Sequence, residues 1–119
     1  MNLDIVSLRP FIGSKDFEVS KSFYKDLGFT ESPISEEMSR FYRDQFSFYL
    51  QDAFVEDWNH NTMLFIEIKD VDECHNEITK LGFDKKYGVK VTPIKKDSWG
   101  RECFLLDPSG VLLHFGQFG

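Results

Sequence analysis

The amino-acid sequence predicts an α+β protein built from two βαβββ modules. The main observation is an internal repeat: residues 16–29 return as residues 70–83, and both stretches begin with Asp and end in Leu-Gly-Phe. A repeat spaced by nearly half of the chain indicates two copies of one supersecondary unit. In each half, a strand-like run precedes the repeat and three follow it. The 119 residues are expected to form a single domain, with modules at about 1–52 and 61–119.

The first module opens with an apolar run over residues 5–12, which we expect to be a strand. Asp16 follows as an N-cap whose side chain can accept a hydrogen bond from a free backbone amide. Apolar residues then recur at helical spacing up to Gly28, which can take the left-handed conformation that ends a helix. Three further strands are expected at residues 29–34, 38–42 and 46–51.

The second module repeats this order after a linker at residues 52–60. A strand is expected at residues 63–68, and Asp70 with Glu73 three residues later forms a capping-box-like start for the helix. Gly82 ends that helix as Gly28 ends the first. The remaining strands are expected at residues 89–94, 102–106 and 111–115, the last two joined by an Asp-Pro-Ser-Gly turn of type I.

Composition limits the class of partner. No apolar run is long enough to span a bilayer, and the formal net charge of −6 disfavours nucleic acid while favouring cationic or neutral partners. The first residues lack the basic and apolar regions of a signal peptide, so we expect a cytoplasmic protein with free thiols at Cys74 and Cys103. Aromatic residues make up 16% of the chain, including 13 Phe, which favours an aromatic-lined cavity.

Several short motifs accompany the doubled module: Asn61-Thr62, Trp99-Gly100-Arg101-Glu102, Asp107-Pro108 and His114-Phe115. With these motifs the chain resembles the glyoxalase, bleomycin-resistance and extradiol-dioxygenase superfamily, also called the vicinal oxygen chelate proteins. Within this superfamily it resembles the bleomycin resistance proteins most. It implies that the two modules curve into a cup-shaped open barrel around a ligand cavity.

The resemblance also implies four inward positions that hold a divalent metal in the enzymes of the superfamily. They fall near Arg9 and Phe48 and at Met63 and His114. Such a metal needs imidazole nitrogens and carboxylate or amide oxygens, and only His114 could supply one. We therefore expect no metal, no cofactor and no catalytic residue. His114 is either a structural histidine of the sheet or a polar contact to a bound ligand.

Bleomycin resistance proteins imply a homodimer that sequesters a planar cationic drug in a cleft between its subunits. Trp99 matches the stacking tryptophan of that cleft, or else it anchors a loop. Met38 stands where a second aromatic residue is expected, and a thioether can also pack on a ring. The nearby Glu31, Glu36 and Glu37 favour a cationic ligand. The ligand-binding residues expected on this basis are Trp99, Met38, Phe48, Met63, Phe65, Arg101 and His114.

Three functions follow from these observations. The leading hypothesis is a small-molecule-binding protein of the bleomycin-resistance type, which protects against an antibiotic by binding an aromatic or cationic ligand. The alternative is a vicinal-oxygen-chelate metalloenzyme, a glyoxalase-type lyase or a dioxygenase, with an atypical site. A third is a relative whose ligand is not an antibiotic. Binding is better supported than bleomycin itself, because the aromatic partner of Trp99 is missing.

Overall fold

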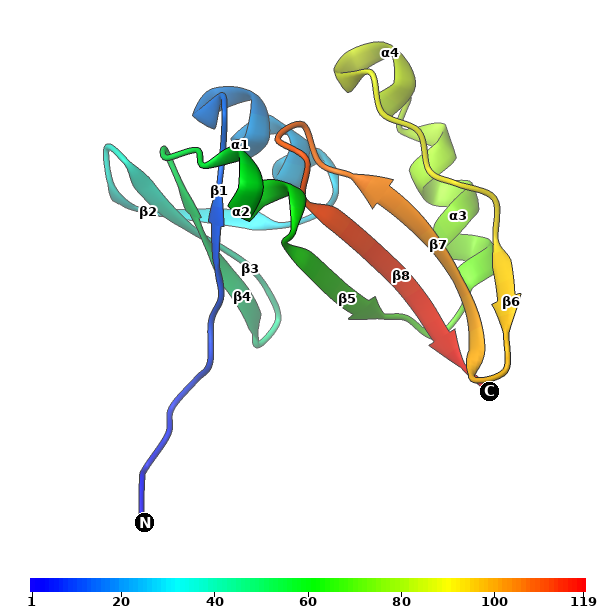
Figure 1. The fold of residues 1–119 in the computed structure, drawn as a ribbon, viewed down its shortest axis with the longest axis horizontal. Helices are drawn as coiled ribbons and strands as arrows, with labels where there is room; N and C mark the ends of the chain where they lie inside the picture. The colour runs from blue at the N-terminus through cyan, green and yellow to red at the C-terminus, as the bar shows by residue number, and fades with distance from the viewer.

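The computed structural model describes residues 1–119 as two four-stranded mixed sheets of identical topology (Figure 1). The first sheet has the order β1-β4-β3-β2 and the second the order β5-β8-β7-β6. The strand β1 pairs with β4 in parallel, and β5 pairs with β8 in parallel. All other pairs are antiparallel. The strands are β1 (Phe11–Gly13), β2 (Thr30–Ser35), β3 (Met38–Arg43), β4 (Phe46–Gln51), β5 (Met63–Glu67), β6 (Lys95–Asp97), β7 (Gly100–Leu106) and β8 (Leu112–Phe118). The predicted α+β fold class is confirmed.

The repeated segments form the helices α1 (Phe17–Asp26) and α3 (Val71–Lys80), with the predicted caps. Asp16 Oδ1 accepts a hydrogen bond from the amide of Val19 at 3.1 Å, and Asp70 Oδ1 accepts one from Glu73 at 3.1 Å. Gly28 follows α1 with a φ of 108°, a conformation that favours glycine. Two short helices lie outside the predicted pattern, α2 (Glu56–His60) and α4 (Phe83–Tyr87).

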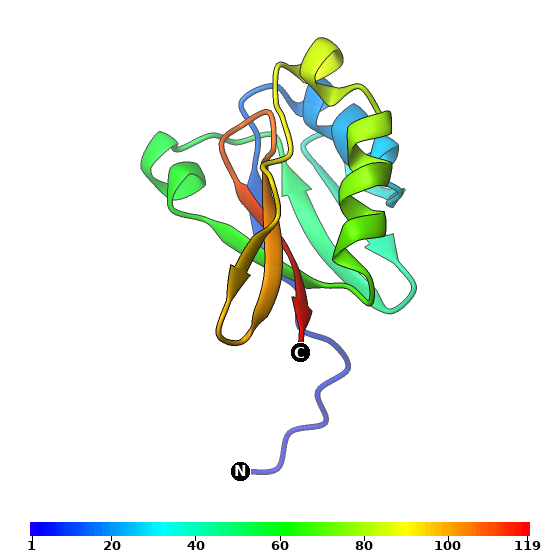
Figure 2. The ribbon, with the colours of Figure 1, turned by 90° about the vertical axis from the view of Figure 1, so that its right-hand side faces the viewer.

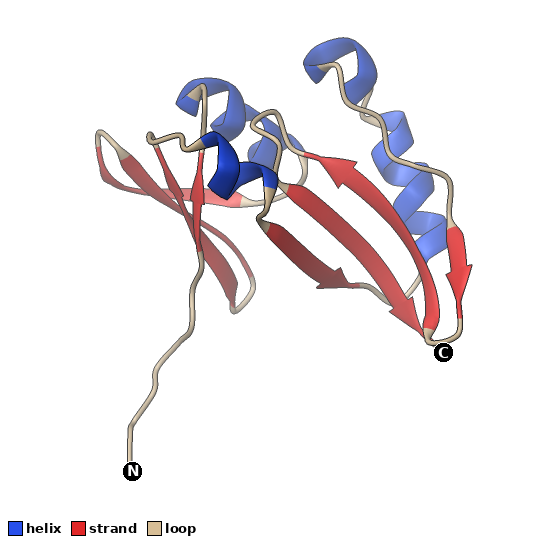
Figure 3. Cartoon of the chain, in the orientation of Figure 1, coloured by secondary structure: helices blue, strands red, loops and turns tan.

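Two predicted strands are wrong in extent. Instead of a strand over residues 5–12, β1 spans three residues and residues 1–10 form an extended arm that leaves the body of the molecule (Figures 1 and 3). Val6 and Leu8 on this arm are more than nine-tenths exposed, because no strand of this chain lies beside them. Residues 89–94 are irregular. The Phe104 amide donates its hydrogen bond to the side-chain hydroxyl of Thr92, at 2.9 Å, where a strand partner would offer a backbone carbonyl.

The helices lie on the inner faces of the two sheets and join them in one hydrophobic core. Figure 2 shows α1, α3 and α4 gathered on one side of the molecule. A buried hydrogen bond connects the modules, from the Tyr24 hydroxyl of α1 to Asp107 Oδ2 in the turn between β7 and β8, at 2.6 Å. Burial, with the charge of Asp107, raises the pKa of Tyr24 well above its usual value.

Each sheet consequently has one face that no helix covers. Side chains alternate between the two faces of a strand, so the residues between the core positions point away from the core. We call these surfaces the first open face (Arg9, Phe11, Met38, Arg40, Tyr42, Ser47, Tyr49 and Gln51) and the second open face (Met63, Phe65, Glu102, Phe104, Leu106, Leu112, His114 and Gly116). No helix is long and apolar enough to cross a membrane.

Candidate ligand-binding site

Three aromatic rings form a partly exposed cluster at the β5 and β8 end of the second open face. Phe65 lies 5.8 Å from Trp99 and 5.7 Å from Phe118, and Trp99 lies 5.1 Å from Phe118, between ring centroids. Gly116 lies beneath them, since a Cβ there would stand 2.3 Å from Cζ of Phe65. Phe65 is 47% exposed and Phe118 57% exposed. This aromatic cluster can stack on a flat ligand.

A histidine and a carboxylate lie next to the aromatic cluster. His114 Nδ1 is 2.9 Å from Glu102 Oε1, and its Nε2 is 3.4 Å from the sulfur of Met63. The ring of Phe104 packs edge-on against His114 at 4.8 Å, and Phe65 lies 6.3 Å away. Because Glu102 fixes one ring nitrogen, His114 presents its other side towards the open face. The pair can give a ligand one oriented polar contact within an apolar surface.

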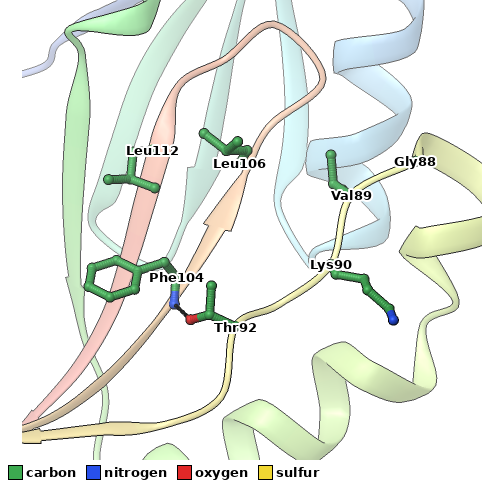
Figure 4. Close-up of a pocket in the computed structure, with 7 residues that line it drawn as sticks. All are labelled: Gly88, Val89, Lys90, Thr92, Phe104, Leu106 and Leu112. Carbon is green, nitrogen blue, oxygen red and sulfur yellow. Dashed lines mark hydrogen bonds between the residues drawn. The ribbon is translucent and has the colours of Figure 1, made fainter.

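The second open face continues into a cavity of about 440 Å³ below the 88–92 connection (Figure 4). Figure 4 shows Phe104, Leu106 and Leu112 on the strand side, with Val89 and Thr92 opposite them. The volume falls within the range of small-molecule sites, roughly 300 to 1,000 Å³. Phe104 belongs both to this cavity and to the packing around His114. One apolar surface therefore runs from the aromatic cluster to the cavity.

The residues at the four metal positions do not fit a divalent cation. Phe48 points into the core, where its ring stacks on Phe41 at 5.8 Å. Arg9 is cationic, and the thioether of Met63 is a poor ligand for a hard metal. His114 and Glu102 offer one donor pair, and no group of three or more His, Cys, Asp or Glu could hold a metal. No chemical step through a metal can be derived from this donor set.

The structure brings some predicted ligand-binding residues together and separates others. Trp99, Phe65, Met63 and His114 meet at the second open face. Their role in binding a ligand stays a prediction, as does that of Met38, which lies on the other sheet opposite Gln51.

Phe48 and Arg101 lie away from both open faces. Phe48 is 4% exposed and packs on Tyr24 at 4.8 Å, because the buried positions of β4 are residues 48 and 50. Arg101 points towards α3, where its guanidinium binds Asp72 at 2.9 Å. Neither side chain lies on an open face, and a role in ligand binding for Phe48 and Arg101 stays a prediction.

The first open face holds polar and aromatic residues that the sequence reasoning missed. Arg9 Nε donates to Ser47 Oγ at 2.9 Å, and Arg9 Nη1 donates to the Tyr49 hydroxyl at 3.0 Å. The rings of Phe11 and Tyr49 stack at 5.0 Å. The signal was available, because Ser47 and Tyr49 alternate with Phe48 and a buried leucine along β4.

Comparison with solved structures identifies the fold. The bleomycin-binding protein of Streptomyces verticillus, complexed with copper(II)-bleomycin, is similar at 23% identity and a TM-score of 0.79, covering 99% of each chain. The antibiotic-binding protein TnmS3 of Streptomyces sp. CB03234 shares 21% identity with a TM-score of 0.79, covering 99% of this chain and 100% of that one. A lactoylglutathione lyase of Agrobacterium tumefaciens shares 13% identity with a TM-score of 0.72, covering 95% of this chain and 94% of that one.

These similarities define the class: the chain has the glyoxalase/bleomycin resistance fold, over nearly its whole length. No protein-family profile matches the sequence, and no curated protein matches it. The fold includes both antibiotic-binding proteins and a lyase. The function must therefore be argued from the residues of the open faces.

Proposed function

We propose that this protein binds a small aromatic molecule between two copies of the chain and sequesters it without transforming it, as bleomycin-resistance proteins do. The observation that carries the proposal is the aromatic cluster of Phe65, Trp99 and Phe118, which lies on a face that no helix of its own chain covers and leaves the rings of Phe65 and Phe118 about half exposed. His114 and the adjoining cavity supply one polar contact and additional apolar surface. The similar antibiotic-binding folds favour an antibiotic as ligand, encountered in the cytoplasm.

A second copy of the chain is part of the proposal for a geometric reason. The helices pack on one face of each sheet and lie on one side of the molecule, so a single chain does not close its open faces over a ligand. The first open face of a partner can cover the second open face of this chain. The apolar arm of residues 1–10 can then pair with the partner, which is a low-cost route to a dimer.

The dimer is tested by removing the arm. Deletion of residues 1–8 is expected to shift the protein from about twice the 14.0 kDa chain mass to a monomer in sedimentation, with an unchanged far-UV spectrum. Replacing only Asp4 of the arm by Asn is the matched control and should leave the dimer intact. A full-length chain that sediments as a monomer at micromolar concentration would count against a shared site.

Ligand binding is tested by the fluorescence of Trp99. The chain has two tryptophans, and Trp58 is 73% exposed on α2, so the Trp58→Phe variant isolates the signal of Trp99. An aromatic ligand that stacks on the cluster is expected to quench this signal at one molecule per chain; bleomycin is titrated first, and the Trp99→Phe variant serves as control. If high micromolar drug causes no quenching, bleomycin is excluded, and a thermal-shift screen of aromatic metabolites and antibiotics then decides whether any ligand stabilises the folded protein.

Metal analysis separates binding from the enzyme alternative. Protein purified without a chelator is expected to contain far less than one transition metal per chain, because His114 and Glu102 are the only donors placed together on the second open face. The His114→Ala variant provides the comparison. Near-stoichiometric metal in the original protein, lost in the variant, would overturn the sequestration proposal in favour of a metalloenzyme.

A further inference from the structure

The first open face has an unusual charge for this protein. The chain carries a formal net charge of −6, yet this face holds Arg9, two residues before β1, and Arg40 on β3, and no carboxylate. Neither arginine forms a salt bridge, although six other lysine and arginine side chains do. Two cationic groups without a counter-ion on one sheet face attract an anion.

Arg9 is held in place by neutral partners. Its Nε and Nη1 donate to hydroxyls of Ser47 and Tyr49, and its guanidinium carbon lies 5.8 Å from the Tyr49 ring centroid. These bonds orient the guanidinium but leave its charge uncompensated. A guanidinium has five N–H donors, so further donors remain free for an anion. Planar, oriented donors of this kind suit carboxylate, sulfate and phosphate oxygens.

Arg40 lies next to Tyr49, one of the two residues that hold Arg9. It stands directly opposite Tyr49 in the register of β3 and β4, and its guanidinium carbon lies 4.8 Å from the ring centroid of Tyr42. Stacking on a ring leaves the edge of a guanidinium available for hydrogen bonds. The two arginines thus flank one tyrosine on the same face.

Three acidic residues were expected nearby. Glu36 and Glu37 lie in the turn between β2 and β3 and form no salt bridge with either arginine, and Glu31 is turned away from this face. Glu31 on β2 points to α1, and its carboxylate pairs with Lys25 at 2.9 Å and with Lys21 at 3.7 Å. The same carboxylate accepts a hydrogen bond from the Ser39 hydroxyl of β3 at 2.6 Å. Burial opposes its ionisation, but these partners outweigh burial and lower the pKa of Glu31. Glu31 therefore neutralises lysines of the helix and does not compensate Arg40.

We propose that the ligand is an aromatic molecule bearing an anionic group, a carboxylate, sulfate or phosphate, which Arg9 and Arg40 bind. This rests on the proposed function, since a second copy would bring the aromatic cluster opposite the two arginines. It departs from a bleomycin-like cationic ligand. Another role for the two arginines would be to hold the dimer interface itself, and the experiment separates the two roles.

A matched pair of probes tests the charge requirement. 1-Anilinonaphthalene-8-sulfonate carries a sulfonate, and N-phenyl-1-naphthylamine has the same aromatic frame without it. Both are titrated by fluorescence into the full-length protein and into the variants Arg9→Gln, Arg40→Gln and Arg43→Gln. Arg43 is the control because it lies at the end of β3, away from the first open face. It lines a groove between the two modules, together with Leu27 of the first module and Ile66 and Phe115 of the second. Sedimentation of each variant reports the dimer.

We expect the sulfonate probe to bind the original protein at least about tenfold more tightly than the neutral probe, the effect of one charge-assisted hydrogen bond. Arg9→Gln and Arg40→Gln should each remove most of this preference and leave the neutral probe and the dimer unchanged. Arg43→Gln should have no effect.

Other outcomes overturn the inference in distinguishable ways. Equal binding of both probes, unaffected by the arginines, refutes the anionic group and leaves aromatic binding standing. If Arg43→Gln alone weakens the sulfonate probe, that probe occupies the groove between the modules and the arginines of the open face are not its site. If Arg9→Gln and Arg40→Gln dissociate the dimer and lower the affinity for both probes equally, the arginines serve the interface. If neither probe binds the original protein, this inference fails together with the proposed aromatic site.

Discussion

Replacing Tyr24 by Phe should destabilise the protein by about 2 kcal/mol, through a single buried hydrogen bond. Tyr24 is 1% exposed and Asp107 2% exposed, and the O–O distance between them is 2.6 Å. A hydrogen bond to a charged group contributes about 1.5 to 3 kcal/mol, because the alternative is a buried carboxylate with one partner fewer. Asp107 keeps its bonds from the amides of Ser109 and Val111, which limits the loss.

The expected loss converts into a measurable shift. Unfolding entropy is roughly 2.1 cal/mol/K per residue, or about 0.25 kcal/mol/K for a chain of this length, so 2 kcal/mol lowers Tm by about 8 °C. Urea denaturation at pH 7 measures the free energy of unfolding directly. Tyr42→Phe is the matched control, because the Tyr42 hydroxyl makes no hydrogen bond and its ring keeps the contact with Arg40.

The pH dependence identifies the bond as the cause. Burial raises the pKa of Asp107, against the hydrogen bonds from Tyr24 and from backbone amides. A raised pKa in the folded state favours the protonated form, so the contribution of Asp107 to stability is greatest below its unfolded value of 3.8 and falls as pH rises through the folded value. As pH falls from 7 to 4, Asp107 takes up a proton and the Tyr24 hydroxyl loses its charged acceptor. The free energy lost in Tyr24→Phe should therefore be smaller at pH 4 than at pH 7. A loss below 0.5 kcal/mol at pH 7, or one that is the same at both pH values, would refute the reasoning.

Three further predictions concern other parts of the molecule. Gly116→Ala places a Cβ against the half-exposed ring of Phe65, which should move aside at a cost of about 1 kcal/mol while aromatic ligands bind at least about tenfold more weakly; unchanged binding by titration would argue against the aromatic cluster. Glu31→Gln should cost below about 1 kcal/mol at pH 7 and less at pH 4, since a lowered pKa stabilises only above the unfolded value; denaturation at both pH values measures this. Burial raises the pKa values of Cys74 and Cys103 to about 11, so both thiols should react with a thiol reagent at pH 8 much more slowly in the folded protein than in urea, and equal rates would contradict the burial.

Local signals in the sequence predicted the elements that depend on local chemistry. Asp16 and Asp70 cap helices because a short carboxylate reaches the free amide three residues on, whatever surrounds it. The repeat predicted two equal modules, and both sheets have the same topology. Residues 5–10 were mistaken for part of a strand because an apolar run predicts a strand only if another strand lies beside it to pair with. Sequence does not specify which chain supplies that partner.

The candidate site was predicted less well, because it depends on which face of each strand is covered. At Phe48 the alternation of β4 already favours the core: Ser47 and Tyr49 occupy the positions between the buried residues. The resemblance placed an inward, ligand-facing position near Phe48, and the structure puts the Phe48 ring in the core. Arg101 shows the converse, since nothing in its own segment predicts that Asp72 of α3 would bind it.

The location of the aromatic cluster has a consequence for binding measurements. In a single chain the cluster faces solvent, and the proposed site is complete only when a second copy covers it. Ligand affinity and dimer affinity are then linked, because whatever binds only the dimer shifts the equilibrium towards it. Apparent Kd should fall as protein concentration rises through the dimer dissociation constant, and ligand should lower the concentration at which dimers form. Titrations at two protein concentrations, one on each side of that constant, test this linkage. The same Kd at both would mean that one chain binds the ligand alone.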